Sequence, residues 1–109
     1  KFYIDNIKLT GVILPIEAKK EFNSYHTFVI QHEKRDQLKK YLSEKGISTA
    51  IHYPTPIHLQ PASSCLGYKL GDFPECEKQS RRILSLPINQ YLSKKDLKTI
   101  CSVINSFEN

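Results

Sequence analysis

The most strand-like stretch of the chain reads Tyr25-His26-Thr27-Phe28-Val29-Ile30-Gln31-His32. In an extended conformation, its apolar side chains would point to both faces of a sheet. A strand with apolar residues on both faces is typical of the covered, central part of a sheet. We therefore predict a strand over residues 25–32. His26 and His32 would lie on one strand face, with His26 buried and hydrogen-bonded and His32 at the strand end.

The residues after this stretch predict a helix and then a second strand. Between Arg35 and Lys45, apolar side chains recur every three or four residues, and Gly46 supplies a helix stop. Residues 47–53 then alternate as a strand does, with small residues and His52 on one face. The small neighbours leave space beside His52 for a helix or a ligand.

Two more helices are predicted towards the C-terminus. Asp72-Phe73-Pro74-Glu75 has the form of a capping box with proline in the first turn, and Ser93-Lys94-Lys95-Asp96 forms a second cap. The side chains predicted to line one side of the first helix are Phe73, Cys76, Ser80, Ile83 and Leu84. Those predicted to line the second are Leu97, Ile100, Cys101, Ile104 and Phe107.

The remaining segments complete the predicted architecture. Residues 2–9 resemble the end of a helix that stops at Gly11, and residues 12–15 are predicted to be extended because they end in a proline. Three prolines exclude regular structure between residues 53 and 64. The order is strand, helix, strand, loop, helix, helix. The predicted fold class is α+β, with a short, mostly antiparallel sheet covered by helices.

Length and composition bound the class of protein. A chain of 109 residues, 39% of them hydrophobic and 25% charged, suits one globular domain. The net charge of +5 is interleaved with acidic residues, which favours a solvated surface over nucleic-acid binding. No apolar run is long enough for a membrane span. Three cysteines without a close pair favour a reducing cytoplasm over disulfides or zinc, with Cys76 and Cys101 buried.

The segment richest in chemically useful side chains is Ile51-His52-Tyr53-Pro54-Thr55-Pro56-Ile57-His58-Leu59-Gln60-Pro61. It carries His52, Tyr53, His58 and Gln60 on a loop stiffened by prolines, which lowers the cost of holding polar groups towards a ligand. The residue types leave two interpretations open, a binding loop and a packed surface loop. A metal site is disfavoured, because two histidines alone do not complete a coordination sphere. No catalytic triad, glycine-rich phosphate loop or pair of catalytic carboxylates is recognisable.

Several motifs occur in an order that is specific to one family. They are Asn23-Ser24-Tyr25-His26-Thr27-Phe28-Val29-Ile30, Arg35-Asp36-Gln37-Leu38, Gly46-Ile47-Ser48-Thr49, the segment 51–61, Leu66-Gly67-Tyr68, Gly71-Asp72-Phe73-Pro74, Glu77 and Leu84-Ser85-Leu86-Pro87. With these motifs the chain resembles the C-terminal domain of the DegT/DnrJ/EryC1/StrS family of sugar aminotransferases. The resemblance implies that residues 1–10 end an inter-domain helix and that residues 11–109 form the small C-terminal domain.

The resemblance also implies a fold and an activity. The fold is that of aspartate-aminotransferase-type (fold type I) enzymes, in which a large domain holds pyridoxal phosphate on a lysine and the small domain closes the cleft. The implied reaction transfers an amino group from an amino acid such as glutamate to a nucleotide-linked keto sugar. The implied parent protein is a cytoplasmic homodimer that binds neither nucleic acid nor a membrane.

The family's cofactor-binding groups have no matching positions in this chain. We therefore expect no catalytic, cofactor-binding or metal-binding residue here, no bound pyridoxal phosphate and no activity of the chain alone. The predicted substrate contacts are His52 and Tyr53, followed by His58 and Gln60. Two alternatives stay open, a non-catalytic regulatory or binding module and a family member that dehydrates sugars. The motifs identify neither the sugar, nor the nucleotide, nor the pathway.

Overall fold

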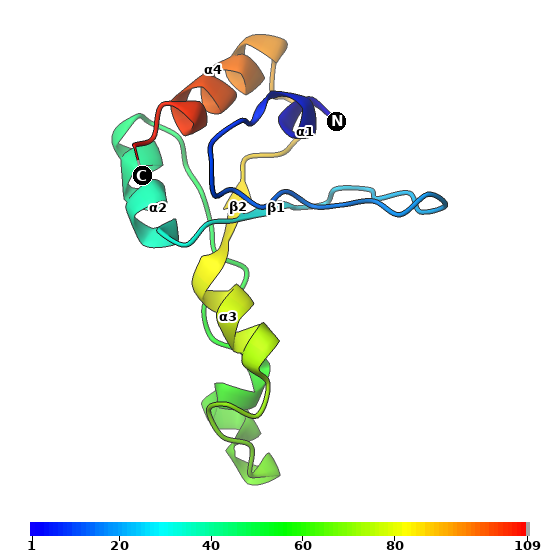
Figure 1. Ribbon diagram of the computed structural model, residues 1–109, viewed down its shortest axis with the longest axis vertical. Coiled ribbons are helices and arrows are strands. Elements are labelled where there is room, and N and C mark those ends of the chain that lie inside the picture. Colours follow the sequence, from blue (N-terminus) through cyan, green and yellow to red (C-terminus); the bar gives the residue numbers. More distant parts are fainter. Residues whose placement is uncertain (109) are drawn as a thin grey trace.

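A short antiparallel sheet separates two unlike parts of the molecule in the computed structural model, which describes residues 1–108. In chain order the elements are α1 (Phe2–Asn6), β1 (Phe28–Gln31), α2 (Arg35–Glu44), the 3₁₀ helices η1 (Ile57–Leu59) and η2 (Pro61–Leu66), α3 (Pro74–Arg82), β2 (Ile83–Leu86) and α4 (Lys94–Asn105). Helices α1, α2 and α4 lie on one side of the sheet (Figure 1). Residues 56–79, called the lobe below, extend away on the other side.

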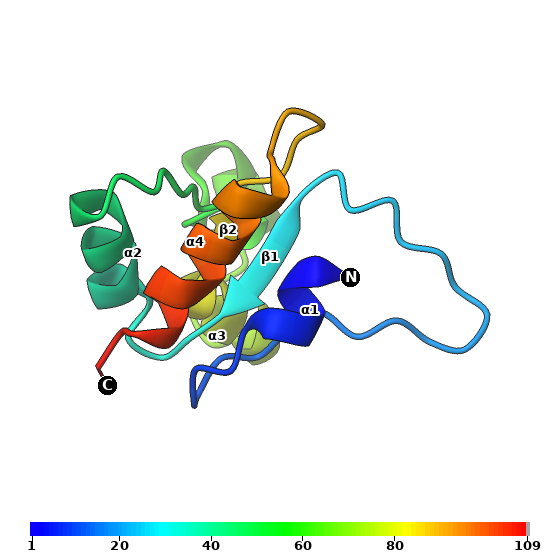
Figure 2. The ribbon, with the colours of Figure 1, turned by 90° about the horizontal axis from the view of Figure 1, so that it is seen from above.

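The shape is extended for a chain of this length. Its radius of gyration is 15.5 Å and its principal extents are 48 × 36 × 25 Å, whereas a compact domain of similar length has a radius of gyration of roughly 13 Å. One projection is the lobe, and the other is an arm formed by residues 15–27, which stands clear of the helices (Figure 2). Ile16 and Phe22 on the arm are 92% and 94% exposed.

The hydrophobic core lies between the sheet and the three helices. β1 and β2 pair antiparallel, with Phe28 opposite Leu86 and Ile30 opposite Leu84, and all four side chains are buried on one face. The helices cover this face with the rest of the core, which consists of Tyr3, Ile7, Leu38, Leu42, Ile47, Ile100, Cys101, Ile104 and Phe107. Burial of this continuous apolar set supplies the main driving force for folding.

The predicted strand over residues 25–32 is present in shortened form as β1. Ile13 pairs with Gln31 on one side of β1 and β2 lies on the other, which confirms both the central position of the strand and the extended residues 12–15. The strand begins only at Phe28 because Tyr25 has a positive φ of 48° and its N–H donates to the Asn23 side chain. His26 therefore lies outside the strand and is exposed, so its predicted burial is wrong.

The predicted strand over residues 47–53 is wrong. Ala50 alone pairs with Ser85, through backbone hydrogen bonds of 2.8 and 3.2 Å, and its neighbours form no ladder. The alternation of side chains is present only in part, because Ile47 is buried and Ile51 packs against the core, whereas Tyr53 is exposed. Alternation without an available partner edge does not make a strand, since strand pairing is set by long-range contacts.

Helix α2 confirms the prediction over residues 35–45, and Gly46 follows it with a positive φ of 77°. Its Arg35 has a second role, because the buried guanidinium donates to the carbonyl oxygens of Ser80 at 3.3 Å and Ile83 at 3.0 Å. These are carbonyls that the end of α3 leaves without helical partners. Arg35 thereby attaches the C-terminal end of α3 to the helix-covered half.

The helix predicted from Pro74 is confirmed at its start and wrong at its end. It stops at Arg82, and Ile83 and Leu84 belong to β2. The predicted capping box is also wrong, because Asp72 accepts from Lys69 N–H and the N-cap is Phe73. Cys76, predicted to be buried, is exposed.

The other predictions for the ends of the chain have mixed outcomes. Ser93 and Asp96 form the predicted capping box of α4, and Cys101 is buried as predicted. Helix α1 ends at Asn6, before the predicted stop at Gly11. The prediction of no regular structure between residues 53 and 64 is wrong, because this region contains the short 3₁₀ helix η1 and most of η2. Proline is accepted in the first turn of a helix. No helix within residues 1–108 is long and apolar enough to cross a membrane.

Candidate functional site: a cleft between the proline-rich loop and helix α3

A cleft of about 390 Å³ lies between the proline-rich loop and α3. Its lining residues come from these two segments and from the start of β2, and they are His52, Tyr53, Thr55, Pro56, Ile57, Cys76, Gln79, Ser80 and Ile83. The Ala50–Ser85 bridge fixes the start of the loop on the sheet, and Arg35 holds the far end of α3. Both walls of the cleft are therefore attached to the helix-covered half.

His52 lies at the sheet end of this cleft. Its Nδ1 atom is 3.0 Å from the hydroxyl oxygen of Ser85, which is buried on β2. Within residues 1–108, its other ring nitrogen, Nε2, has no hydrogen-bond partner. The imidazole is thus held by one edge and has a free polar edge.

Tyr53 is the most exposed aromatic residue of the cleft. Its side chain is 72% exposed and meets the His52 ring edge-on, with the ring centroids 5.6 Å apart. The peptide bond between the two residues is cis. A tyrosine that exposes most of its ring offers an apolar face and a hydroxyl to whatever covers the cleft.

His58 lies inside the lobe, in contact with a carboxylate. Its Nε2 is 2.9 Å from Oε1 of Glu77, and both side chains are almost fully buried. Because a carboxylate only accepts, Nε2 carries the proton and donates. The same oxygen accepts from Gly71 N–H at 2.8 Å and from Phe73 N–H at 3.4 Å. This arrangement, called the Glu77 clasp below, joins η1 to the start of α3.

The clasp favours an ionised Glu77. Burial alone would raise its pKa, but the hydrogen bonds from Gly71 N–H, His58 and Phe73 N–H outweigh burial, and the pKa lies below the ordinary value. Glu77 also supplies a negative charge to the first turn of its own helix, where the helix dipole favours one. The buried carboxylate is therefore charged at neutral pH.

Gln60 closes the proline-rich loop on itself. Its side-chain amide donates to the carbonyl oxygen of Thr55 at 3.2 Å. The four predicted contacts thus separate in space. His52 and Tyr53 line the cleft, Gln60 braces the loop that contains them, and His58 is bound to Glu77.

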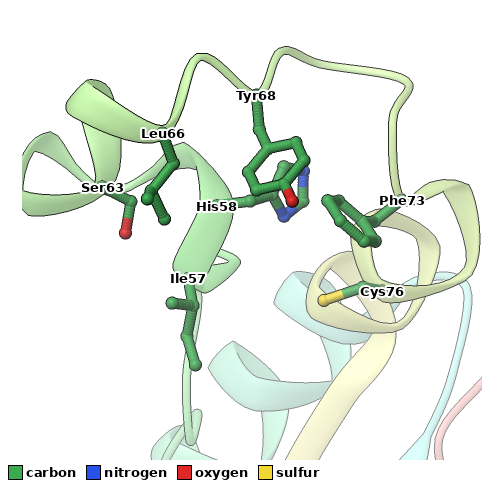
Figure 3. A pocket seen from close by; sticks show the side chains of 7 residues that line it. All are labelled: Ile57, His58, Ser63, Leu66, Tyr68, Phe73 and Cys76. Carbon is green, nitrogen blue, oxygen red and sulfur yellow. The ribbon is translucent and has the colours of Figure 1, made fainter.

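A second, more apolar cleft of about 290 Å³ lies on the lobe (Figure 3). The rings of His58 and Tyr68 both lie against Phe73, with centroids 4.8 and 5.0 Å away, and Leu66 and Ile57 form the opposite side. The side chain of Ile57 is 75% exposed. Glu77 contacts two members of this group, because its Oε1 accepts from the His58 ring and from Phe73 N–H.

Two residues central to this geometry, Ser85 and Glu77, were not predicted as site residues. Both belong to the quoted family motifs, but their types and spacing indicate no role. Each acts on a histidine far away in the sequence, His52 for Ser85 and His58 for Glu77. Within residues 1–108, no group of three or more His, Cys, Asp or Glu side chains forms a metal site.

A family model and several known proteins match this chain in sequence. A model of the DegT/DnrJ/EryC1/StrS aminotransferase family matches residues 2–105. The chain is 38% identical over 96 residues to the "pleiotropic regulatory protein" of Geobacillus stearothermophilus. The aligned residues make up 88% of this chain and 26% of that protein. The chain is 33% identical over 99 residues to dTDP-3-amino-3,4,6-trideoxy-alpha-D-glucose transaminase of Streptomyces venezuelae, covering 91% and 26% respectively.

The structural comparison agrees with the sequence comparison. The crystal structure of S. venezuelae DesV in complex with a ketimine intermediate matches with a TM-score of 0.90 and 33% identity, over 94% of this chain and 28% of that chain. This likeness confirms the predicted α+β fold class, that of the small domain of such aminotransferases. The chain spans about a quarter of the length of the curated relatives it matches.

Proposed function

This chain belongs to the DegT/DnrJ/EryC1/StrS aminotransferase family, and from that premise we propose that it is the small domain of a pyridoxal-phosphate-dependent nucleotide-sugar aminotransferase. Residues 1–10, of which Phe2–Asn6 are helical, would carry the end of the inter-domain helix, and residues 11–109 would form the small domain. The family match over residues 2–105 carries this proposal. The names of several relatives, which specify transaminases of dTDP- and UDP-linked sugars, support the class of substrate.

The residues of this chain do not fit pyridoxal phosphate. The cofactor needs a lysine in a sheltered site and a cradle of donors for its phosphate. Every lysine from residue 1 to residue 108 is exposed, apart from the half-buried Lys39, and none lines the cleft beside His52. In the proposal, another part of a longer polypeptide holds the cofactor, and this chain contributes a wall of the substrate pocket.

His52 and Tyr53 are the proposed contacts to the sugar nucleotide. The free Nε2 of His52 can hydrogen-bond a sugar hydroxyl or a phosphate oxygen, and the exposed ring of Tyr53 can pack against a flat or apolar part of the ligand. His58 and Gln60 support these contacts by shaping the loop, through their bonds to Glu77 and Thr55. A catalytic role is assigned to none of the four.

The rest of the proposal follows the family. The amino donor is an amino acid such as glutamate, and the parent enzyme is a homodimer in the cytoplasm. Exposed apolar side chains on the arm and the lobe support the presence of covering partners in the parent protein, because a monomeric protein rarely exposes large apolar patches. Ile16, Phe22 and Ile57 are the most exposed of these.

A regulatory function is the second candidate, and one observation favours it. The relative from G. stearothermophilus, at 38% identity, bears the name of a regulatory protein. The two candidates for the longer protein can be distinguished by chemistry. An aminotransferase needs a lysine that binds pyridoxal phosphate, whereas a regulatory protein does not.

The distinguishing experiment uses the polypeptide encoded by the complete reading frame. Under the proposal, it binds pyridoxal phosphate with a visible absorption band, and borohydride reduction attaches the cofactor to a lysine outside residues 1–109. Incubation with glutamate and a keto sugar nucleotide then yields an amino sugar nucleotide. A complete polypeptide that binds no cofactor would favour the regulatory candidate. A cofactor bound to a lysine of this chain would contradict the proposed division of labour.

A further inference from the structure

Ser85 stands out on the sheet face that the core does not use. Ser85 belongs to β2 and pairs with Val29 of β1. Its side chain is buried, although it points to the sheet face opposite to that of the core residues Leu84 and Leu86. Its backbone exchanges two hydrogen bonds with Ala50. These bonds hold the loop residue two positions before His52 against β2, so Ser85 lies at the fixed base of the loop.

The Ser85 hydroxyl also contacts the imidazole that the loop presents. The distance from its oxygen to Nδ1 of His52 is 3.0 Å. His52 is therefore tied to β2 twice, through the backbone at Ala50 and through its own ring. The remaining ring nitrogen, Nε2, is directed away from Ser85 by the geometry of imidazole, and the ring lines the cleft.

In a neutral imidazole, the hydrogen bond at one ring nitrogen is coupled to which nitrogen carries the proton. A serine hydroxyl can donate to that nitrogen or accept from it, and each direction belongs to one tautomer. If the hydroxyl of Ser85 donates to Nδ1, the neutral ring must carry its proton on Nε2. That nitrogen can then donate to an oxygen in the cleft. A nucleotide sugar presents hydroxyl and phosphate oxygens, for which a donor is the matching group.

We propose that Ser85 is a positioning residue that holds His52 in the tautomer with the proton on Nε2, so that the ring donates to an oxygen of the sugar nucleotide. This inference rests on the proposed function for its ligand. The Ser85–His52 geometry itself does not depend on the ligand. Ser85 touches no substrate in the proposal and acts only through His52.

The test is a ¹H–¹⁵N spectrum of the histidine rings of the 109-residue chain, recorded at a pH where the rings are neutral. The two nitrogens of a neutral imidazole have separate ¹⁵N shifts that identify the protonated one. The wild-type chain is expected to show His52 with Nε2 protonated and Nδ1 accepting. Ser85→Ala is expected to give a mixture of tautomers, and Ser85→Thr, which keeps the hydroxyl, a pattern like wild type.

Ser80→Ala is the matched control. It removes another serine hydroxyl beside the cleft, whose bond runs to the carbonyl oxygen of Glu77, and it should leave the His52 tautomer unchanged. A wild-type His52 with its proton on Nδ1 would overturn the proposal. So would an unchanged His52 spectrum in Ser85→Ala, or the same mixture in Ser85→Thr as in Ser85→Ala.

A kinetic arm separates this inference from the proposed function. In the longer polypeptide, Ser85→Ala is expected to lower kcat/KM for the sugar nucleotide about three- to tenfold, the loss typical of one neutral hydrogen bond. The half-reaction with glutamate should be unchanged. If the spectra are as expected but the longer polypeptide reacts with no sugar nucleotide, then Ser85 does position His52. In that case the sugar nucleotide is not the ligand, and the proposed function is refuted. Normal sugar kinetics in Ser85→Ala would overturn the inference and leave the proposed function standing.

Discussion

The helix-covered half and the lobe of this molecule are held together by different forces. In the helix-covered half, apolar side chains from the sheet and three helices bury one another, and Ile30, Leu38, Leu42, Leu84 and Ile104 are fully buried. In the lobe, the side chains of the polar pair His58 and Glu77 are almost fully buried, while most of the apolar ones are exposed. The first pattern is that of a hydrophobic core, whereas the second leaves apolar side chains exposed on the surface.

This difference has a functional meaning in the proposal. The half with the core provides a rigid base, to which Ser85 and Arg35 attach the two walls of the cleft. The lobe extends the wall of the cleft outwards and buries few apolar side chains in doing so. Its exposed residues are then available for contact with other parts of a longer protein.

The largest expected effect on stability comes from removing a core side chain. Leu84→Ala should lower the free energy of unfolding by about 2–5 kcal/mol, because it leaves a cavity at a fully buried position. Urea unfolding followed by far-UV circular dichroism measures this loss. Leu66→Ala is the control in the lobe, where the side chain is 63% exposed, and it should change stability little. Similar losses in the two variants would remove the distinction between the regions.

A smaller effect is expected at the start of α4. Ser93→Ala removes the side chain that accepts from Asp96 N–H in the capping box. Loss of such a cap typically costs about 1 kcal/mol. Because α4 covers the core face of the sheet, the melting temperature of the whole chain should fall. Thr99→Ala is a suitable control, since its hydroxyl bonds only to a carbonyl oxygen in its own helix.

The smallest effect on global stability is expected at the Glu77 clasp, where the change should stay local. The pKa of Glu77 is lowered, so the clasp is fully formed above the ordinary carboxyl value of about 4.5 and is lost as the pH falls through the lowered value. The ring resonances of Tyr68 and Phe73 should therefore move in acid, because these rings pack beside His58.

The Glu77→Gln variant sharpens this expectation. Its amide oxygen can still accept from Gly71 and Phe73, but it does not titrate. The acid-dependent movement of the Tyr68 and Phe73 resonances should therefore be absent, while the far-UV spectrum keeps its wild-type form. An acid transition of the same size in Glu77→Gln would show that another group controls the lobe.

The sequence predicts those elements whose signals are local. Helix α4 combines a capping box with an apolar stripe, and α2 combines a similar stripe with Gly46, so both were correctly located. Strand β2 was missed because Ile83 and Leu84 continue the helical spacing of α3. Only its pairing with β1, more than 50 residues earlier, distinguishes this run as a strand.

The same limit applies to the site. The histidine and tyrosine types and the prolines of residues 51–61 were enough to select His52 and Tyr53 as candidates. No local pattern distinguishes His52, which keeps a free ring nitrogen, from His58, which is bound to Glu77. That distinction depends on a partner 33 residues away for His52 and 19 residues away for His58.

The most direct test of the proposed role is single-turnover kinetics of the two half-reactions in the longer polypeptide, for wild type and His52→Ala. If His52 contacts the sugar nucleotide, amino transfer to the sugar should slow by roughly one to two powers of ten, the cost of losing a hydrogen bond of about 1–3 kcal/mol. The half-reaction with glutamate should change much less, and the melting temperature should stay close to that of wild type. Equal losses in both half-reactions, together with a lowered melting temperature, would contradict a substrate-binding role and assign His52 to the packing of the loop.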